Sequence, residues 1–444
     1  MQKKINTSYF KKLALISAVC AASMSPFTQA ESDTNTRIEQ LEKIVKELQQ
    51  TLNQQKRSLV TTQDLSMANA NNLKSVEIAS GSDPDHSYKF GGFIKVTGSA
   101  SEYSDGDIGK GLGRDIYVPG LIPVKDSASA YKGSDTQMQA KESRINFVSK
   151  HNLANGSKIK TYLEMDFLGS SQGNERVSNS YSPRLRHAFF TYDNWLFGQT
   201  WTTFQNVGAL PESADFLAAS EGIIFGRQTQ IRYTNGNFQF SLENPETTIT
   251  PNGGGARIVN NSDTVPDFIV RYNLKGNWGN MSAALLARQL AYEDGANKIN
   301  ESTSALGLSL TGKFMLGKDD IRWNINTGSG MGRYVGLNTA NGAVINATGS
   351  LEAIDSTSGS VAYRHHWNER WRSNFILSAM MIDNDTDLTG MSVTSDVQSA
   401  QVNLLFSPTK SMTLGGGLLM ANREIESGDD GDLTRLILTA KYGF

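Results

Sequence analysis

The chain has 444 residues, of which 38% are apolar and 19% are charged. Both shares fall below those of ordinary globular domains, roughly 45–50% and about 25%, and Gly, Ser, Thr and Asn make up the difference. The chain has no run of about 18 apolar residues, which excludes a helical membrane protein. A net charge of -2 excludes a strongly basic nucleic-acid-binding protein.

Residues 1–30 have the features of a secretory signal peptide. An apolar stretch, 13–22, ends before the small residue Ala30 and is too short for a membrane anchor. A cationic start precedes it, made of Lys3, Lys4, Lys11 and Lys12. The single cysteine, Cys20, lies in this segment, so we expect a mature chain without a disulfide, a thiol nucleophile or a cysteine metal site.

Residues 31–60 are predicted to form an α-helical coiled coil. Apolar residues recur with heptad spacing at Ile38, Leu41, Val45, Leu48, Leu52 and Leu59. This pattern of about three heptads does not fix the number of helices, and a single surface helix is the alternative. Residues 61–87 are rich in Ser, Asn and Asp and are interpreted as a linker.

From residue 88 to residue 444, apolar and polar residues alternate with a period of two, which is typical of strands. Sixteen candidate strands are 88–101, 140–150, 157–168, 183–193, 195–203, 228–234, 237–243, 267–275, 277–291, 302–313, 319–326, 359–367, 370–382, 396–407, 410–422 and 433–444. Short turns alternate with long loops between them, which is the plan of outer-membrane barrels. The predicted fold is therefore an all-β transmembrane barrel of sixteen antiparallel strands, 88–444, behind an N-terminal coiled coil.

The last strand supports this fold. Apolar residues occupy alternate positions up to the terminal Phe444, as in the signal that outer-membrane insertion machinery reads. A soluble β-sandwich, the alternative, would need far fewer strands. We expect the outer membrane of a Gram-negative cell, lipid around the barrel, and both barrel ends and the coiled coil on the periplasmic side.

Arginines occupy the face of the strands that alternation assigns to the lumen. Arg232, Arg271 and Arg322 each lie between two apolar residues. An arginine that faces lipid at the membrane midplane costs roughly 2–4 kcal/mol, so the apolar neighbours are expected to face lipid and the arginines the lumen. The predicted pore-lining, solute-binding residues are Arg144, Arg184, Arg186, Arg232, Arg271, Arg322, Arg364 and Arg372. Guanidinium groups bind carboxylates through paired hydrogen bonds, and rings of arginine select anions. The alternative is that these arginines pair with Glu142, Glu164, Asp166 and acidic residues of the loops, which would give a nearly neutral, wet lumen.

The loop 204–227 follows the fifth candidate strand. By analogy with porins we expect it to fold into the channel as a constriction, and an outward lid is the alternative. Glu212, Asp215 and Glu221 would then oppose the arginine wall, and Arg227 would join it.

Three motifs carry a resemblance to a known family. The run Gly113-Arg114-Asp115-Ile116-Tyr117-Val118-Pro119, the segment 90–95 and the segment 183–187 resemble the DcaP-like outer-membrane porin family. The resemblance implies a homotrimer of sixteen-stranded barrels with a periplasmic coiled coil. It also implies uptake of small negatively charged molecules, especially dicarboxylates.

The sequence therefore predicts a passive outer-membrane diffusion channel selective for small anions such as dicarboxylates. The alternatives are a nonspecific general porin, or a structural anchor tethered by its coiled coil. We predict no enzyme, cofactor or metal site, because no phosphate loop or metal-spaced histidine cluster is present. His187 alternates in step with Leu185 and Phe189, which places it at a rim.

Overall fold

The structure is a computed structural model that describes residues 76–78, 85–125, 131–170, 172–260 and 262–444. These residues belong to one compact unit, Ala68–Phe444. The predicted signal peptide and coiled coil lie outside the described residues.

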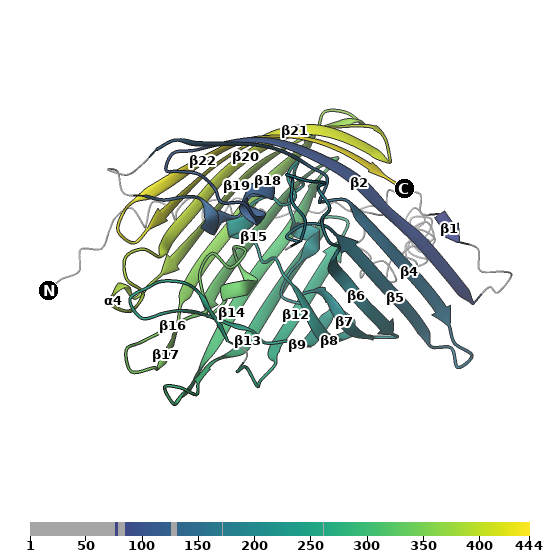
Figure 1. Ribbon diagram of the computed structural model, residues 1–444. Helices are drawn as coiled ribbons and strands as arrows, with labels where there is room; N and C mark the ends of the chain where they lie inside the picture. The colour runs from purple at the N-terminus through teal and green to yellow at the C-terminus, as the bar shows by residue number, and fades with distance from the viewer. Residues whose placement is uncertain (1–75, 79–84, 126–130, 171, 261) are drawn as a thin grey trace, which may run out of the picture. The chain divides into compact units, whose positions relative to one another are not determined.

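One antiparallel sheet closes on itself, because the first long strand pairs with the last (Figure 1). Its strands are β2 (His86–Tyr103), β3 (Gly133–Gln139), β4 (Arg144–Asn152), β5 (Lys158–Asp166), β6 (Arg184–Tyr192), β7 (Trp195–Trp201), β8 (Arg227–Asn235), β9 (Phe238–Glu243), β12 (Asp267–Gly276), β13 (Gly279–Asp294), β14 (Ile299–Leu316), β15 (Asp319–Ser329), β18 (Asp355–His366), β19 (Trp371–Asp383), β20 (Thr394–Thr409), β21 (Met412–Ile425) and β22 (Asp430–Gly443). β3 and β4 both pair with β2 and count as one interrupted strand. The wall therefore has sixteen strands, and the predicted barrel is confirmed.

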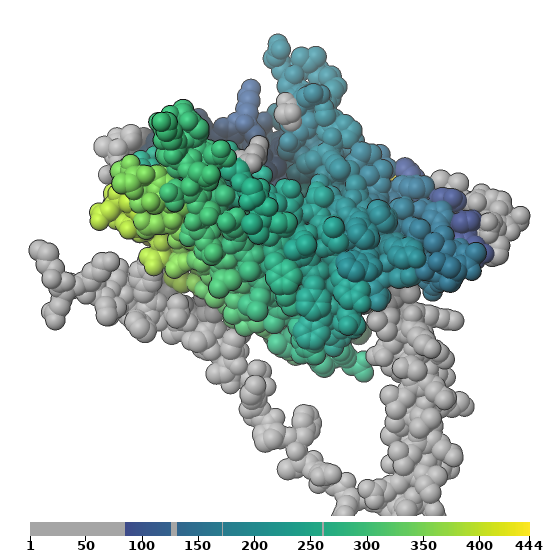
Figure 2. Space-filling view, turned by 90° about the horizontal axis from the view of Figure 1, so that it is seen from below, coloured from purple at the N-terminus to yellow at the C-terminus, as the bar shows by residue number. Residues whose placement is uncertain are grey.

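Each strand turns apolar side chains outward and mostly polar ones inward. On β20, Val402 and Leu404 are exposed, whereas Gln401 and Asn403 are buried. Exposed large apolar residues recur on strand after strand, as a lipid-facing surface requires. Figure 2 shows this outer surface as one continuous wall over the teal and green part of the chain.

The rim position predicted for His187 is wrong. A β-bulge between β5 and β6 skips Arg186, since Glu164 pairs with His187 and Met165 pairs with Leu185. The extra residue reverses the alternation, so Arg186 and His187 are both buried on the inner face. A bulge of this kind leaves no mark in the period-two pattern.

Smaller elements are additional to the sixteen strands of the wall. β1 (Val76–Ile78) pairs with β2, so the segment interpreted as a linker contains a strand. A second sheet joins β11 (Ile258–Asn260), β10 (Thr247–Thr250), β16 (Ala343–Ile345) and β17 (Leu351–Ala353). The helical turns are α3 (Leu112–Asp115), η2 (Pro119–Leu121), η3 (Val207–Ala209), η4 (Ser220–Gly222), η5 (Gly332–Tyr334) and α4 (Thr386–Thr389). None of the helices in the described ranges is long and apolar enough to cross a membrane.

Three long loops pack against the inner face of the wall: L1 (104–125 and 131–132), L3 (202–226) and L6 (330–354). Tyr117 of L1 packs against Leu419 and Leu433, on β21 and β22. Leu217 of L3 packs against β18 and β19. L6 packs against β12, β13 and β19. The apolar core of this protein therefore lies inside the barrel, between loops and wall.

Candidate functional site

L3 crosses the barrel interior from β7 to the opposite wall. The guanidinium of Arg372 on β19 donates to both carboxylate oxygens of Glu212, at 2.6 and 2.8 Å. Arg364 on β18 approaches the same carboxylate at 3.4 Å. Asn403 on β20 donates to the main-chain carbonyl of Glu212 at 3.1 Å. The loop therefore narrows the lumen, which is the position expected of a constriction.

The three arginines with the clearest inward alternation hold L3 in place. Arg232 donates to the carbonyl of Trp201, the last residue of β7, and its Nε donates to the hydroxyl of Thr203 in L3 at 2.8 Å. Arg271 donates to the carbonyl of Gln205, and Arg322 donates to the carbonyl of Leu210. Their guanidinium groups face inward, but they contact the protein instead of an open lumen. They are better described as anchors of the loop.

The acidic residues of L3 differ in their surroundings. Burial raises the pKa of Glu212, but the hydrogen bonds and charge of Arg372, with Arg364, outweigh it and hold the pKa at about 2.

Asp215 and Glu221 do not oppose the arginine wall as expected. Asp215 accepts hydrogen bonds from the main-chain N–H groups of Phe216 and Tyr117. Glu221 is fully buried and accepts a hydrogen bond from Ser399. Burial raises the pKa of both carboxyl groups above their usual values, since neither forms an ion pair among the described residues.

The remaining arginines on the β4–β8 side form a compact charged cluster. Arg184 and Arg186 bind Asp166 at 2.8 and 2.9 Å, and Arg186 also binds Glu164 at 2.7 Å. Arg144 lies 3.8 Å from Glu164. We call Arg144, Arg184, Arg186 and Arg227 the arginine cluster. Among the described residues, the four guanidinium groups form ion pairs with only two carboxylates, so the cluster carries excess positive charge.

Arg227 is the least satisfied member of the arginine cluster. It forms no ion pair within the described part of the chain, and its buried Nη1 has no hydrogen-bond partner there. Its guanidinium lies 4.9 Å from the ring centroid of Trp201 and 5.9 Å from that of Phe225. The ring of Phe216 on L3 lies 5.7 Å from both Arg144 and Arg186. The arginine cluster therefore contacts L3 and the end of β7 through aromatic rings.

Other predicted charges are paired. Arg322 and Arg364 share Asp320 on β15, and Arg364 and Arg372 share Glu212. Glu142 pairs with Lys95 at 2.6 Å instead of with an arginine. The described residues contain no group of three His, Cys, Asp or Glu side chains that could hold a metal ion.

Sequence reasoning missed further inward arginines. Arg288 on β13 donates to the carbonyls of Gly330 in L6 and Glu246. Arg435 on β22 donates to the carbonyl of Gly113 in L1, at 2.9 Å. The same alternation that selected Arg271 places both on the inner face, so the signal was available. Nothing in the sequence pattern marks Tyr334, a fully buried residue of L6.

A closed sixteen-stranded barrel whose lumen is narrowed by an inner loop is the architecture of outer-membrane channels. The family model for the DcaP outer membrane protein matches residues 24–444, and the chain belongs to this family. A search of curated proteins found no match.

Solved structures of channels share this fold. The crystal structure of the outer membrane channel DcaP of Acinetobacter baumannii is 20% identical, with a TM-score of 0.64, and the match covers 82% of this chain and 99% of that one. OmpF of Salmonella typhi in complex with daunomycin is 11% identical, with a TM-score of 0.51 and coverage of 83% and 100%. An anion-selective porin from Comamonas acidovorans is 13% identical, with a TM-score of 0.50 and coverage of 81% and 100%.

Proposed function

We propose that this outer-membrane channel is a passive diffusion pore selective for small anions, with the arginine cluster as its solute-binding site. The observation that carries the proposal is the charge imbalance of four guanidinium groups against two carboxylates at the constriction. Low-dielectric walls concentrate the field of such a cluster and raise the local concentration of anions.

Dicarboxylates are the solute class that suits this site best. Arg227 is only partly buried and forms no ion pair among the described residues, so the exposed part of its guanidinium fork can bind one carboxylate. Arg144 keeps 23% of its side chain exposed and forms only a long ion pair, so it can bind a second carboxylate. Because binding is shared between two incompletely paired arginines, a solute can still leave, as diffusion requires.

The reversal potential in a planar bilayer under a salt gradient tests the selectivity. The wild type is expected to prefer anions, and Arg227→Gln and Arg144→Gln are expected to lower the anion-to-cation permeability ratio several-fold. Arg370→Gln, at the exposed β18–β19 turn, is the matched control. A wild-type channel without charge preference would instead identify a general porin.

The solute class is tested by liposome swelling with succinate, phthalate, lysine and a neutral sugar. The two diacids are expected to enter fastest, and the two substitutions are expected to slow the diacids without slowing the sugar. Equal rates for diacids and lysine would contradict the proposal.

We also propose that residues 1–30 are removed on export, that 31–60 form a periplasmic coiled coil, and that the channel is a homotrimer. The heptad spacing at 38–59 and the family resemblance support this assembly. Light scattering should give a trimer for the mature chain and a less stable trimer without residues 31–67. Envelope blebbing with intact transport after that deletion would favour the tethering role.

A further inference from the structure

L6 lies against the constriction loop inside the barrel. Met331, Tyr334 and Val335 are completely buried. They share an apolar cluster with Phe204 and Ile224, two residues of L3. The rings of Phe204 and Tyr334 meet edge to face, with centroids 5.9 Å apart. L6 therefore fills the space behind L3 that would otherwise allow the loop to move.

Main-chain hydrogen bonds join the two loops. The N–H of Phe225 donates to the carbonyl of Tyr334 at 3.0 Å, and the N–H of Gly336 donates to the carbonyl of Ile223 at 3.4 Å. Ile224 and Val335 form an antiparallel β-bridge between them. The second half of L3 is thus paired with L6, whereas its first half is held by wall arginines.

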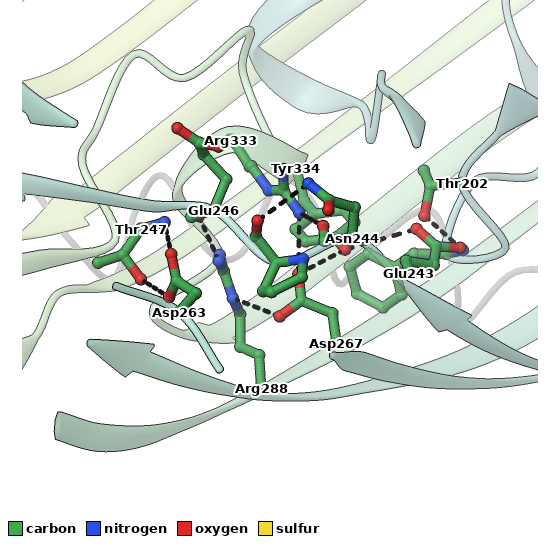
Figure 3. Close-up of polar contacts among 12 residues, drawn as sticks. Thr202, Glu243, Asn244, Glu246, Thr247, Asp263, Asp267, Arg288, Arg333 and Tyr334 are labelled. Carbon is green, nitrogen blue, oxygen red and sulfur yellow. Dashed lines mark hydrogen bonds and ion pairs between the residues drawn. The ribbon is translucent and has the colours of Figure 1, made fainter. Parts of the chain in front are cut away.

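One buried carboxylate attaches L6 to the wall (Figure 3). Asp267, at the start of β12, accepts from the Tyr334 hydroxyl at 2.8 Å and from Arg333 at 3.1 Å. It also accepts from Arg288 of β13 at 3.2 Å. Since Asp267 is fully buried, these three donors replace the water that an exposed carboxylate would bind.

A second carboxylate contacts both loops. Glu243, at the end of β9, accepts from the main-chain N–H of Thr203 in L3 at 2.7 Å. The hydroxyl of Tyr334 reaches the same carboxylate at 3.4 Å. Tyr334 therefore joins the Asp267 anchor, Glu243 and the backbone of L3.

We propose that L6 is a brace that holds the constriction loop in place, and that Tyr334 and Asp267 are the positioning residues that set this brace. The brace determines how steadily the constriction is held, and it does not determine the charge preference of the channel. This proposal goes beyond the proposed anion selectivity and does not depend on it, because neither Tyr334 nor Asp267 belongs to the arginine cluster.

Single-channel recording of Tyr334→Phe tests the proposal. The substitution keeps the ring and removes one hydroxyl that is bonded to a buried carboxylate. We expect about tenfold more time in altered-conductance substates, with an unchanged anion-to-cation permeability ratio. Tyr363→Phe is the matched control, since its hydroxyl binds Asp319 at the same 2.8 Å at the exposed short-turn end.

A disulfide between the loops provides a rescue. Paired residues of antiparallel strands have Cα atoms about 4.5–5.5 Å apart, within the range that a disulfide spans. Ile224→Cys with Val335→Cys in the Tyr334→Phe background is expected to be noisy when reduced and quiet when oxidised. Folding of every variant is checked by heat-dependent migration on gels.

Two results would overturn the proposal. One is a folded Tyr334→Phe channel as quiet as the Tyr363→Phe control. The other is an oxidised double-cysteine channel as noisy as the reduced one. If Tyr334→Phe does not fold, Arg333→Met replaces it, because this substitution removes a different donor to Asp267. The two cysteines are then introduced into Arg333→Met, and the oxidised and reduced channels are compared in the same way.

Discussion

The inward arginines of this barrel fall into two groups that differ in their partners. Arg271 and Arg322 donate to main-chain carbonyls of L3, and Arg232 donates to the Thr203 hydroxyl of L3 and to the carbonyl just before the loop. Arg144 and Arg227 keep unpartnered nitrogen atoms beside aromatic rings at the constriction. The difference is made by the path of the loop, since an arginine that meets a carbonyl becomes an anchor. An arginine with only aromatic contacts or a long ion pair remains available to a solute.

The anchor role extends to all three inner loops. Arg435 and Arg423 hold carbonyls of L1, and Arg288 holds a carbonyl of L6. Buried carbonyl groups need donors, and a wall arginine supplies several from one side chain. An arginine-rich inner face therefore does not by itself indicate anion selectivity, and its partners must be known.

The largest expected effect is that of Asp166→Asn. Its carboxylate is fully buried and pairs with both Arg184 and Arg186. Removing one partner of such a buried pair costs about 3–5 kcal/mol. Urea unfolding in detergent should show this loss, whereas the exposed Asp107→Asn should unfold like the wild type. A wild-type midpoint for Asp166→Asn would show that this pair does not stabilise the wall.

The next effect separates anchors from the solute site directly. Arg271→Met with Arg322→Met removes two charged donors to L3, each worth about 1.5–3 kcal/mol. We expect a larger size limit for neutral sugars and unsteady conductance, with little change in the permeability ratio. Arg227→Gln should do the reverse. If both variants changed the permeability ratio equally, the division between the two groups would be wrong.

Acidic residues of L3 should respond to pH in opposite directions. The pKa of Glu212 is lowered to about 2, so its contribution to stability is present above the usual value of 4.5 and is lost as the pH falls toward 2. The pKa of Glu221 is raised, so its ionisation opposes folding as the pH rises.

Thermal unfolding of variants at several pH values measures these two responses. Glu212→Gln should lose most stability relative to the wild type at neutral pH and little near pH 2. The stability of Glu221→Gln relative to the wild type should increase as the pH rises. Parallel pH profiles for the two variants would contradict these assignments.

The smallest expected effect is that of Arg322→Lys. Lysine keeps the charge beside Asp320 but lacks the planar fork that reaches both Asp320 and the Leu210 carbonyl. We expect a loss of about 1 kcal/mol and slightly noisier conductance. A lysine variant as impaired as Arg322→Met would indicate that the loop contact, and not the charge, accounts for the whole effect.

The sequence by itself determined the barrel. Strand alternation and the lengths of the connections predicted sixteen strands and their inward face. The reason is that the side of each strand that faces lipid accepts only apolar side chains, so the polar residues between them must face inward. The bulge at Arg186 escaped this reasoning, since one extra residue is invisible in a period of two.

Only the tertiary structure decided what the inward residues touch. Arg322 meets the carbonyl of Leu210, and Asp267 meets Tyr334, across 112 and 67 residues of chain. Such partners depend on how L3 and L6 pack inside the barrel, and irregular loops have no periodicity that could encode their path. Alternation sets the side of the sheet on which a side chain lies, and loop packing sets its partner and thus its role.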